Sequence, residues 1–163
     1  MHVRGPLGAF LLAGSLWALS GCETSTSDKD LAKESVLVSL ADVRQMMSDR
    51  DAGEEHALLL IDPRAPKYFA EGHLPGARNL RLPDVREDQP RDPALERYAR
   101  LVVYGENPGS AVAKAMFKRL LAVGYSGIRF FPGGLAEWRS SGYEAETSEP
   151  PAAQDGADTE AGS

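Results

Sequence analysis

Short apolar runs and amphipathic stretches alternate along the middle of the chain. His56–Ile61 is a continuous apolar run, which is typical of a central strand covered on both faces of a sheet. Leu101–Tyr104 and Ile128–Phe131 read as further buried strands, and Ser35–Leu40 is a short β-like run. We therefore expect strands at these four places, and another short strand that begins near Leu80.

Helical periodicity fills the gaps between these runs. Ser39 is a candidate cap for a helix over Ala41–Ser48, and a long apolar-periodic stretch starts near Ser110 and stops at Gly124. The predicted buried face of that long helix consists of Val112, Met116, Phe117, Leu120 and Leu121. Shorter helices are expected over Ala65–Glu71, Ala94–Tyr98 and from Gly133 to Gly142. Strands that alternate with helices predict an α/β fold, with a mostly parallel central sheet flanked by helices in one domain of about 110 residues.

One stretch has the layout of an active-site loop. A strand that ends at Tyr104 is followed by a tight turn, Gly105-Glu106-Asn107-Pro108-Gly109, and then by the helix that starts near Ser110. Ligands of open α/β sheets bind at the carboxyl ends of the strands. A helix N-terminus there offers unpaired N–H groups that stabilise an anion or a thiolate. Gly105 itself has no side chain with which to react.

The charges are unevenly distributed. The chain has 18 Lys and Arg residues against 24 Asp and Glu residues, a net charge of −6. Six of the acidic residues follow Gly142 with no basic residue among them: Glu144, Glu146, Glu149, Asp155, Asp158 and Glu160. The rest of the chain is therefore neutral and has no basic field to attract nucleic acid. Residues 144–163 are expected to form an acidic disordered tail.

The first segment has the features of a secretion signal with a lipid anchor. A short basic start precedes the uncharged apolar stretch Gly5–Ala18, which is too short for a comfortable membrane span. It ends in Leu19-Ser20-Gly21-Cys22, which resembles the lipobox of bacterial lipoproteins. The resemblance implies a signal peptide over residues 1–21, lipid on the thiol of Cys22 and a flexible polar tether over residues 22–34. An ordinary secretory signal with a chance Cys is the alternative.

A lipid on Cys22 would place the protein in the bacterial cell envelope, anchored to a membrane and facing the periplasm. Glu23 follows the Cys, where an Asp is the usual cue for retention in the inner membrane, so the outer membrane is slightly favoured. Cys22 is the single cysteine of the chain, so no intrachain disulfide can form.

Four short motifs in the body resemble the rhodanese homology domain. They are Asp62-Pro63-Arg64, the run from Glu71 to Ala77 (EGHLPGA), Val102-Val103-Tyr104, and the run from Pro132 to Trp138 (PGGLAEW) with Gly142. The resemblance covers Ser35 to Tyr143 and implies a single rhodanese-like domain over residues 35–143, with a three-layer α/β fold. In active members of this family a Cys directly follows the strand that corresponds to Leu101–Tyr104. Its thiolate takes a sulfane sulfur from a donor such as thiosulfate and passes it on from a persulfide.

The same loop departs from the pattern of the active members. Gly105 stands at the position of the nucleophilic Cys, Glu106 stands where a basic residue is common, and Ser110 lies near the loop's other basic position. Pro108 also removes one backbone N–H from the loop. The sequence therefore predicts that the protein lacks sulfurtransferase activity, and Cys22 cannot substitute because lipidation consumes its thiol.

The remaining motif residues are interpreted as structural. Asp62 and Arg64 are expected to hold the loop and its neighbouring backbone, and His73 after Gly72 to hydrogen-bond backbone in its turn. Of the others, Gly133 and Gly134 are expected to allow close packing at a helix start, Trp138 to lie in the core and Tyr104 to be buried. No second ligand lies at metal-binding spacing with His73, so neither a metal site nor a cofactor is predicted.

Three functions stay open at this point. The first is a membrane-anchored binding or scaffold module with a protein partner in the envelope. The second is a related enzyme of altered chemistry, in which the loop binds an anion and Ser110 or His73 acts on it. The third is a docking partner for a separate protein that brings the thiol.

Overall fold

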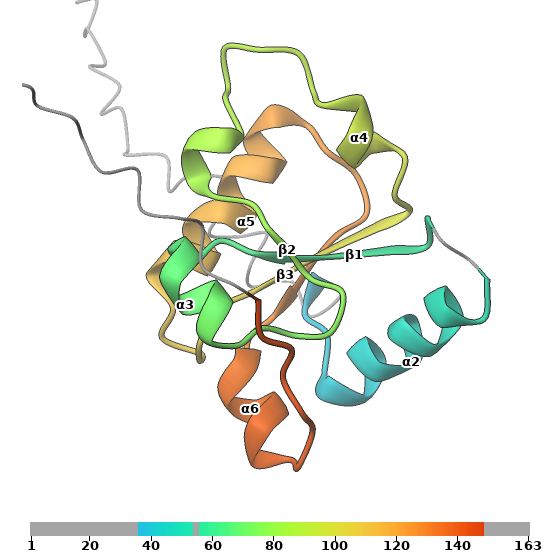
Figure 1. The fold of residues 1–163 in the computed structure, drawn as a ribbon. Coiled ribbons are helices and arrows are strands. Elements are labelled where there is room, and N and C mark those ends of the chain that lie inside the picture. The colour runs from blue at the N-terminus through green and yellow to red at the C-terminus, as the bar shows by residue number, and fades with distance from the viewer. Residues whose placement is uncertain (1–35, 54–55, 149–163) are drawn as a thin grey trace, which may run out of the picture.

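A four-stranded parallel sheet forms the centre of the computed structural model, which describes residues 36–53 and 56–148 (Figure 1). The strand order is β2-β1-β3-β4. The strands are β1 (Leu58–Asp62), β2 (Arg78–Asn79), β3 (Arg100–Tyr104) and β4 (Ile128–Phe131). Register is regular, with Leu60 opposite Val102 and Val102 opposite Arg129. The predicted α/β fold with a parallel sheet flanked by helices is confirmed.

The alternation of side chains along the strands builds two hydrophobic cores, one on each face of the sheet. Leu59, Leu101 and Ile128 belong to the core under α5 (Ala111–Val123), while Leu58 and Val102 belong to the core under α2 and α6. Helix α2 spans Leu40–Asp51 and α6 spans Gly134–Ser140. In Figure 1, α5 lies above the sheet and α2 and α6 lie below it. Strands covered on both faces are buried throughout, which is why β1 reads as a continuous apolar run.

Capping residues set the ends of the two longest helices. Ser39 caps the start of α2, as predicted, and forms a reciprocal capping box with Asp42. Gly124 ends α5 in the left-handed conformation, with φ +88°. The predicted buried face of α5 was wrong at its edges, because Ala113 is fully buried whereas Val112 and Leu121 are only partly buried. Ala113 is spaced three and four residues from Met116 and Phe117, so these three share the stripe that faces the sheet.

The shorter elements connect the strands. Helix α3 spans Pro66–Glu71 between β1 and β2, and α4 spans Pro93–Glu96, two residues short of the predicted end at Tyr98. A 3-10 turn, η2, spans Leu82–Asp84. No helix among residues 36–53 and 56–148 is long and apolar enough to cross a membrane. The predicted signal peptide, Cys22 and the tether lie outside the described residues.

Two predicted segments differ from the structure. The described part of the β-like run Ser35–Leu40, residues 36–40, forms no strand: Leu37 makes one parallel bridge to Phe130, and the capping box then starts α2. The tail does not begin at residue 144 as predicted, because Glu146 pairs with His73 through two backbone hydrogen bonds of 2.8 and 2.9 Å. The Ser148 N–H donates to the carbonyl of Ala70. Residues 144–148 therefore belong to the domain, and residues 149–163 lie outside the described part of the chain.

Candidate functional site

The loop 105–110 lies at the carboxyl end of β3, beside the end of β1. Ile61 is opposite Val103 in the sheet, so Asp62 at the end of β1 and Tyr104 at the end of β3 reach the same edge. The loop follows directly and leads into α5. This is the edge at which open α/β sheets bind their ligands.

The space beside Gly105 is filled by the side chain of Ser110. A Cβ built on Gly105 would lie 2.2 Å from Ser110 Oγ, 2.4 Å from Ser110 Cβ and 3.0 Å from Ala113 Cβ. Ser110 is the N-cap residue of α5, but its hydroxyl makes no capping hydrogen bond. A larger residue at position 105 therefore requires Ser110 to move.

Two backbone N–H groups of the loop form hydrogen bonds within the loop itself. The Gly109 N–H donates to the side-chain oxygen of Asn107 at 2.9 Å, and the Ser110 N–H donates to the Asn107 carbonyl at 3.0 Å. Pro108 has no N–H to offer. The expected set of unpaired N–H groups before α5 is thus reduced, because Asn107 accepts two of them.

The N-terminus of α6 packs against the same loop. The Leu135 N–H donates to the Gly105 carbonyl at 2.9 Å, and the Ala136 N–H donates to the Glu106 carbonyl at 2.8 Å. Gly134 has φ +61°, and a Cβ there would lie 2.3 Å from the Gly105 carbonyl oxygen. A glycine at position 134 therefore allows both the left-handed backbone and the close contact of helix and loop.

Arg64 links two carboxylates, that of Asp62 at the end of β1 and that of Glu106 in the loop. The fully buried carboxylate of Asp62 accepts from Arg64 Nε at 3.0 and 3.1 Å and from Arg64 Nη2 at 2.7 Å. Arg64 Nη2 also donates to the Gly72 carbonyl at 2.6 Å, and Nη1 pairs with the Glu106 carboxylate. Burial opposes the charge of Arg64, but the hydrogen bond and charge of Asp62 and the charge of Glu106 together raise the pKa of its guanidinium. Arg64 is thus a charged side chain whose main partners belong to the protein itself.

Tyr104, the last residue of β3, is fully buried. Its hydroxyl accepts the Leu74 N–H at 3.0 Å. Burial and the negative charge of Asp62 raise the pKa of the Tyr104 hydroxyl well above its ordinary value. The hydroxyl is a neutral structural acceptor that joins the end of β3 to the turn after α3.

The other motif residues hold the surroundings in place. His73 is buried, stacks on Phe69 with ring centroids 3.8 Å apart, and has Nδ1 2.8 Å from the Phe69 carbonyl. Trp138 is buried in the core under α6 and donates from Nε1 to the Glu144 carbonyl at 2.7 Å. A Cβ on Gly133 would collide with the carboxylate of Glu137, so Gly133 also lies in a close contact.

A cavity of about 400 Å³ opens beside the loop. Its lining residues are Arg64, Tyr68, Glu71, Glu106 and Arg139. Arg64 and Glu106 were singled out from the sequence, and Glu71 was named only as the first residue of the EGHLPGA motif, whereas Tyr68 and Arg139 were not named. Tyr68 and Glu71 are three residues apart in a predicted helix and therefore lie on one face, which is the sequence pattern that could have grouped them. No pattern in the sequence connects Arg139 to them. His73 and Ser110 are not among the lining residues.

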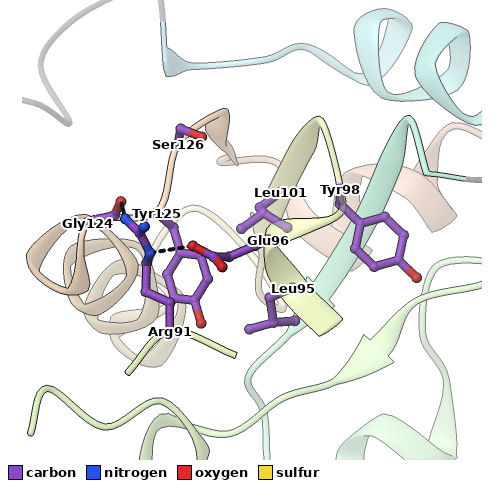
Figure 2. Close-up of a pocket in the computed structure, with 8 residues that line it drawn as sticks. All are labelled: Arg91, Leu95, Glu96, Tyr98, Leu101, Gly124, Tyr125 and Ser126. Atoms are coloured by element: carbon purple, nitrogen blue, oxygen red, sulfur yellow. Dashed lines mark hydrogen bonds and ion pairs between the residues drawn. The ribbon is translucent and has the colours of Figure 1, made fainter. Parts of the chain in front are cut away.

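A second, smaller cavity of about 140 Å³ lies at the opposite edge of the sheet, near the start of β3 (Figure 2). Arg91 crosses it, with Nε 2.5 Å from the carboxylate of Glu96 and Nη1 donating to the Gly124 carbonyl at 2.8 Å. Arg91, Glu96 and the Gly124 carbonyl thus pair with one another. Among the described residues, no group of three or more His, Cys, Asp or Glu side chains is placed to hold a metal ion.

The chain is similar to proteins of one family. Residues 39–141 match the rhodanese-like domain. The thiosulfate sulfurtransferase GlpE of Pseudomonas putida is 31% identical over 96 residues, which cover 59% of this chain and 82% of that protein. The putative thiosulfate sulfurtransferase SseB of Mycobacterium tuberculosis is 29% identical over 140 residues, or 71% of this chain. The match covers 48% of SseB, so this chain spans about half the length of that relative.

Solved structures show the same fold. The BH2092 protein of Bacillus halodurans has a TM-score of 0.57 at 19% identity, covering 74% of this chain and 82% of its own. The RPA3614 protein of Rhodopseudomonas palustris has a TM-score of 0.57 at 21% identity, covering 76% and 96%. The family match spans well over half of the chain, and the protein belongs to the rhodanese-like domain family, which relates it to the sulfurtransferases.

Proposed function

We propose that this protein is a lipid-anchored rhodanese-like domain that has no sulfurtransferase activity and acts as a binding or scaffold module in the cell envelope. The observation that carries the proposal is the environment of Gly105. This residue directly follows β3, where active members of the family carry the nucleophilic Cys, and the side chain of Ser110 occupies the space that a side chain there would need. The space that a cysteine side chain would need at position 105 is therefore occupied by another side chain of the same protein.

The charges and donors of the loop support the same proposal. A persulfide-forming thiolate and an anionic sulfur donor both need positive charge and free N–H groups nearby. Here Glu106 adds a negative charge and pairs with Arg64, and Asn107 accepts the N–H groups of Gly109 and Ser110. A dianion such as thiosulfate would meet a carboxylate where the active members commonly have a basic residue.

The direct test is an assay for sulfur transfer from thiosulfate to cyanide, together with a measurement of cyanolysable sulfur. We expect both to stay at background for the full chain and for a Cys22→Ser variant, which has no thiol at all. Clear turnover that is abolished by substitutions in the loop 105–110 would contradict the proposal.

A rescue experiment tests the role of Ser110 more sharply. In a Cys22→Ser background, Gly105→Cys alone should be destabilised, because its Cβ would lie within 2.4 Å of both Ser110 side-chain atoms. Combining Gly105→Cys with Ser110→Gly removes those atoms and should recover the stability that the single variant loses. Equal stability of the single and double variants would show that Ser110 does not fill the site as described.

The anchor is a separate part of the proposal and rests on the run Leu19-Ser20-Gly21-Cys22 after the apolar stretch Gly5–Ala18. Two or three acyl chains anchor stably, since each buried CH₂ contributes about 0.8 kcal/mol. In a bacterial host, labelled fatty acid should be incorporated into the full chain and not into Cys22→Ser. Fractionation should find the labelled protein in the envelope, with the outer membrane favoured over the inner. Unchanged labelling of Cys22→Ser would refute the anchor and leave the proposal for the domain untouched.

A further inference from the structure

The described part of the chain ends alongside α3, the helix that lines one side of the larger cavity. Residues 144–148, here called the strap, lie against the end of this helix. Glu146 of the strap pairs with His73 through two backbone hydrogen bonds, and the Ser148 N–H donates to the Ala70 carbonyl at 3.1 Å. The last described residue is therefore held at α3 by its own backbone.

The strap also reaches the rim of the cavity. A Cβ built on Gly72 would collide with Nη2 of Arg139 and would lie 3.6 Å from the Cβ of Ala145, so both side chains meet the backbone at one point. Arg139 lines the cavity, and its Nη2 is 3.4 Å from the Glu71 carbonyl. The strap thus passes along one side of the cavity before the chain continues at Glu149.

The direction of the strap carries the next residues toward Tyr68. Between Glu146 and Ser148, the backbone partner changes from His73 to Ala70, so the strap runs antiparallel to α3. An extended residue spans about 3.3–3.6 Å, whereas a helical residue advances about 1.5 Å along the helix axis. The three residues after Ser148 are therefore long enough to reach Tyr68, which lies two residues before Ala70 in α3.

These three residues are Glu149-Pro150-Pro151. A residue that precedes a proline favours an extended or polyproline II backbone, so Glu149 and Pro150 both favour a continuation of the strap in the same line. Proline has no N–H, so a contact made by Pro150 and Pro151 depends on their rings instead of on backbone donors. Proline-rich segments of this kind dock on aromatic side chains.

The cavity offers an aromatic ring and no net charge. Tyr68 is 56% exposed and is one of two exposed large apolar side chains among the described residues. Two arginines, Arg64 and Arg139, balance Glu71 and Glu106 in the lining, so charge selects neither an anion nor a cation. An uncharged occupant with apolar rings suits such a lining. The volume of about 400 Å³ is near the lower end of the range of ligand pockets, which suits a segment of two residues.

We infer that Pro150 and Pro151 pack on the ring of Tyr68 and close the cavity beside the loop 105–110. The occupant is a segment of this chain, and a partner that uses the cavity has to displace it. The inference goes beyond the proposed function and holds whether or not the loop transfers sulfur.

Paramagnetic relaxation measured by NMR tests where the segment lies. In a Cys22→Ser background, an Ala153→Cys variant of the full chain carries a nitroxide two residues after the second proline. The backbone amides of Tyr68, Glu71 and Glu106 should be strongly broadened. The amide of Glu96, at the opposite edge of the sheet, should not. Equal broadening at Glu96 and at the three cavity residues would overturn the inference.

Matched variants separate the contact of the rings from an attraction between charges. Replacing both prolines, Pro150→Gly with Pro151→Gly, should lower the ratio of docked to undocked chains about threefold to tenfold, because the buried apolar area of the rings is lost. Tyr68→Ser should have a similar effect. Ala152→Gly is the backbone control and Lys67→Ser, at an exposed residue of the same helix, is the charge control; neither should change the broadening. An equal loss in Lys67→Ser and Tyr68→Ser, or no loss in the double proline variant, would overturn the inference.

Discussion

Gly134→Ala is the sharpest test of how the candidate site is built. The residue starts α6 with φ +61°, and its Cα faces the loop so closely that an added Cβ would lie 2.3 Å from the Gly105 carbonyl oxygen and 3.0 Å from the Glu106 carbonyl carbon and oxygen. These are backbone atoms, which cannot rotate away as a flexible side chain would. The methyl group therefore has to separate α6 from the loop.

The cost of this change has two parts. A left-handed backbone costs a residue with a Cβ about 1–2 kcal/mol. Separating helix and loop also weakens the hydrogen bonds from Leu135 to Gly105 and from Ala136 to Glu106, each of which contributes about 0.5–1.5 kcal/mol. The sum is about 2–5 kcal/mol, a large fraction of the total of about 5–15 kcal/mol that is typical of a domain.

Gly142→Ala is the matched control. Gly142 is also left-handed, with φ +84°, but a Cβ there meets nothing within 4 Å. This variant should lose only the conformational part, about 1–2 kcal/mol. Urea unfolding followed by circular dichroism gives both values, provided that the slope m is unchanged. If Gly134→Ala is no more destabilised than Gly142→Ala, the close contact between α6 and the loop is not energetically significant.

Two further predictions concern the buried groups under the loop. Asp62→Ala should reduce the free energy of unfolding by about 3–5 kcal/mol, because it leaves the Arg64 guanidinium buried without its carboxylate; a loss below about 1 kcal/mol in urea unfolding would contradict the buried pair. Tyr104→Phe should cost about 1–3 kcal/mol at neutral pH, since the buried Leu74 N–H loses its acceptor. Because the pKa of the Tyr104 hydroxyl is raised in the folded state, the unfolded state loses this proton at a lower pH, above about pH 10. This group should therefore lower the free energy of unfolding by about 1.4 kcal/mol for each pH unit above that value. Unfolding measured between about pH 7 and pH 11 should show a shallower decline in Tyr104→Phe, and identical declines would contradict this assignment.

The fold was predictable because its main elements are set by local pattern. The strands β1, β3 and β4 are largely buried, so each contains a short apolar run: Leu58–Ile61, Leu101–Tyr104 and Phe130–Phe131. Gly124 and Ser39 mark helix ends with residues suited to those ends. The segment 144–148 was missed for the opposite reason. It joins the domain through backbone hydrogen bonds, chiefly between Glu146 and His73, and these leave no hydrophobic periodicity in the sequence.

The candidate site was predictable only in part. The position of Gly105 after a buried strand, and Glu106 beside it, could be read from the order of residues along the chain. The inward hydrogen bonds of Asn107 and the placement of the Ser110 hydroxyl depend on side-chain conformations that the sequence does not specify. Arg139 reaches the cavity from α6, which is far from α3 in the sequence, so only the tertiary structure brings it beside Tyr68.

These side-chain placements change what the absence of a cysteine at position 105 means. Glycine at position 105 has no side chain, and the side chain of Ser110 occupies the space beside it. The carboxylate of Glu106 forms an ion pair with Arg64. Residues that share one space and one charge network do not act additively when they are substituted. A cysteine placed at position 105 without a change at Ser110 would be forced against existing atoms, and a thiolate beside Glu106 would be disfavoured by a like charge. The loop is therefore packed around its glycine, and the carboxylate of Glu106 disfavours a thiolate or an anionic donor at this position.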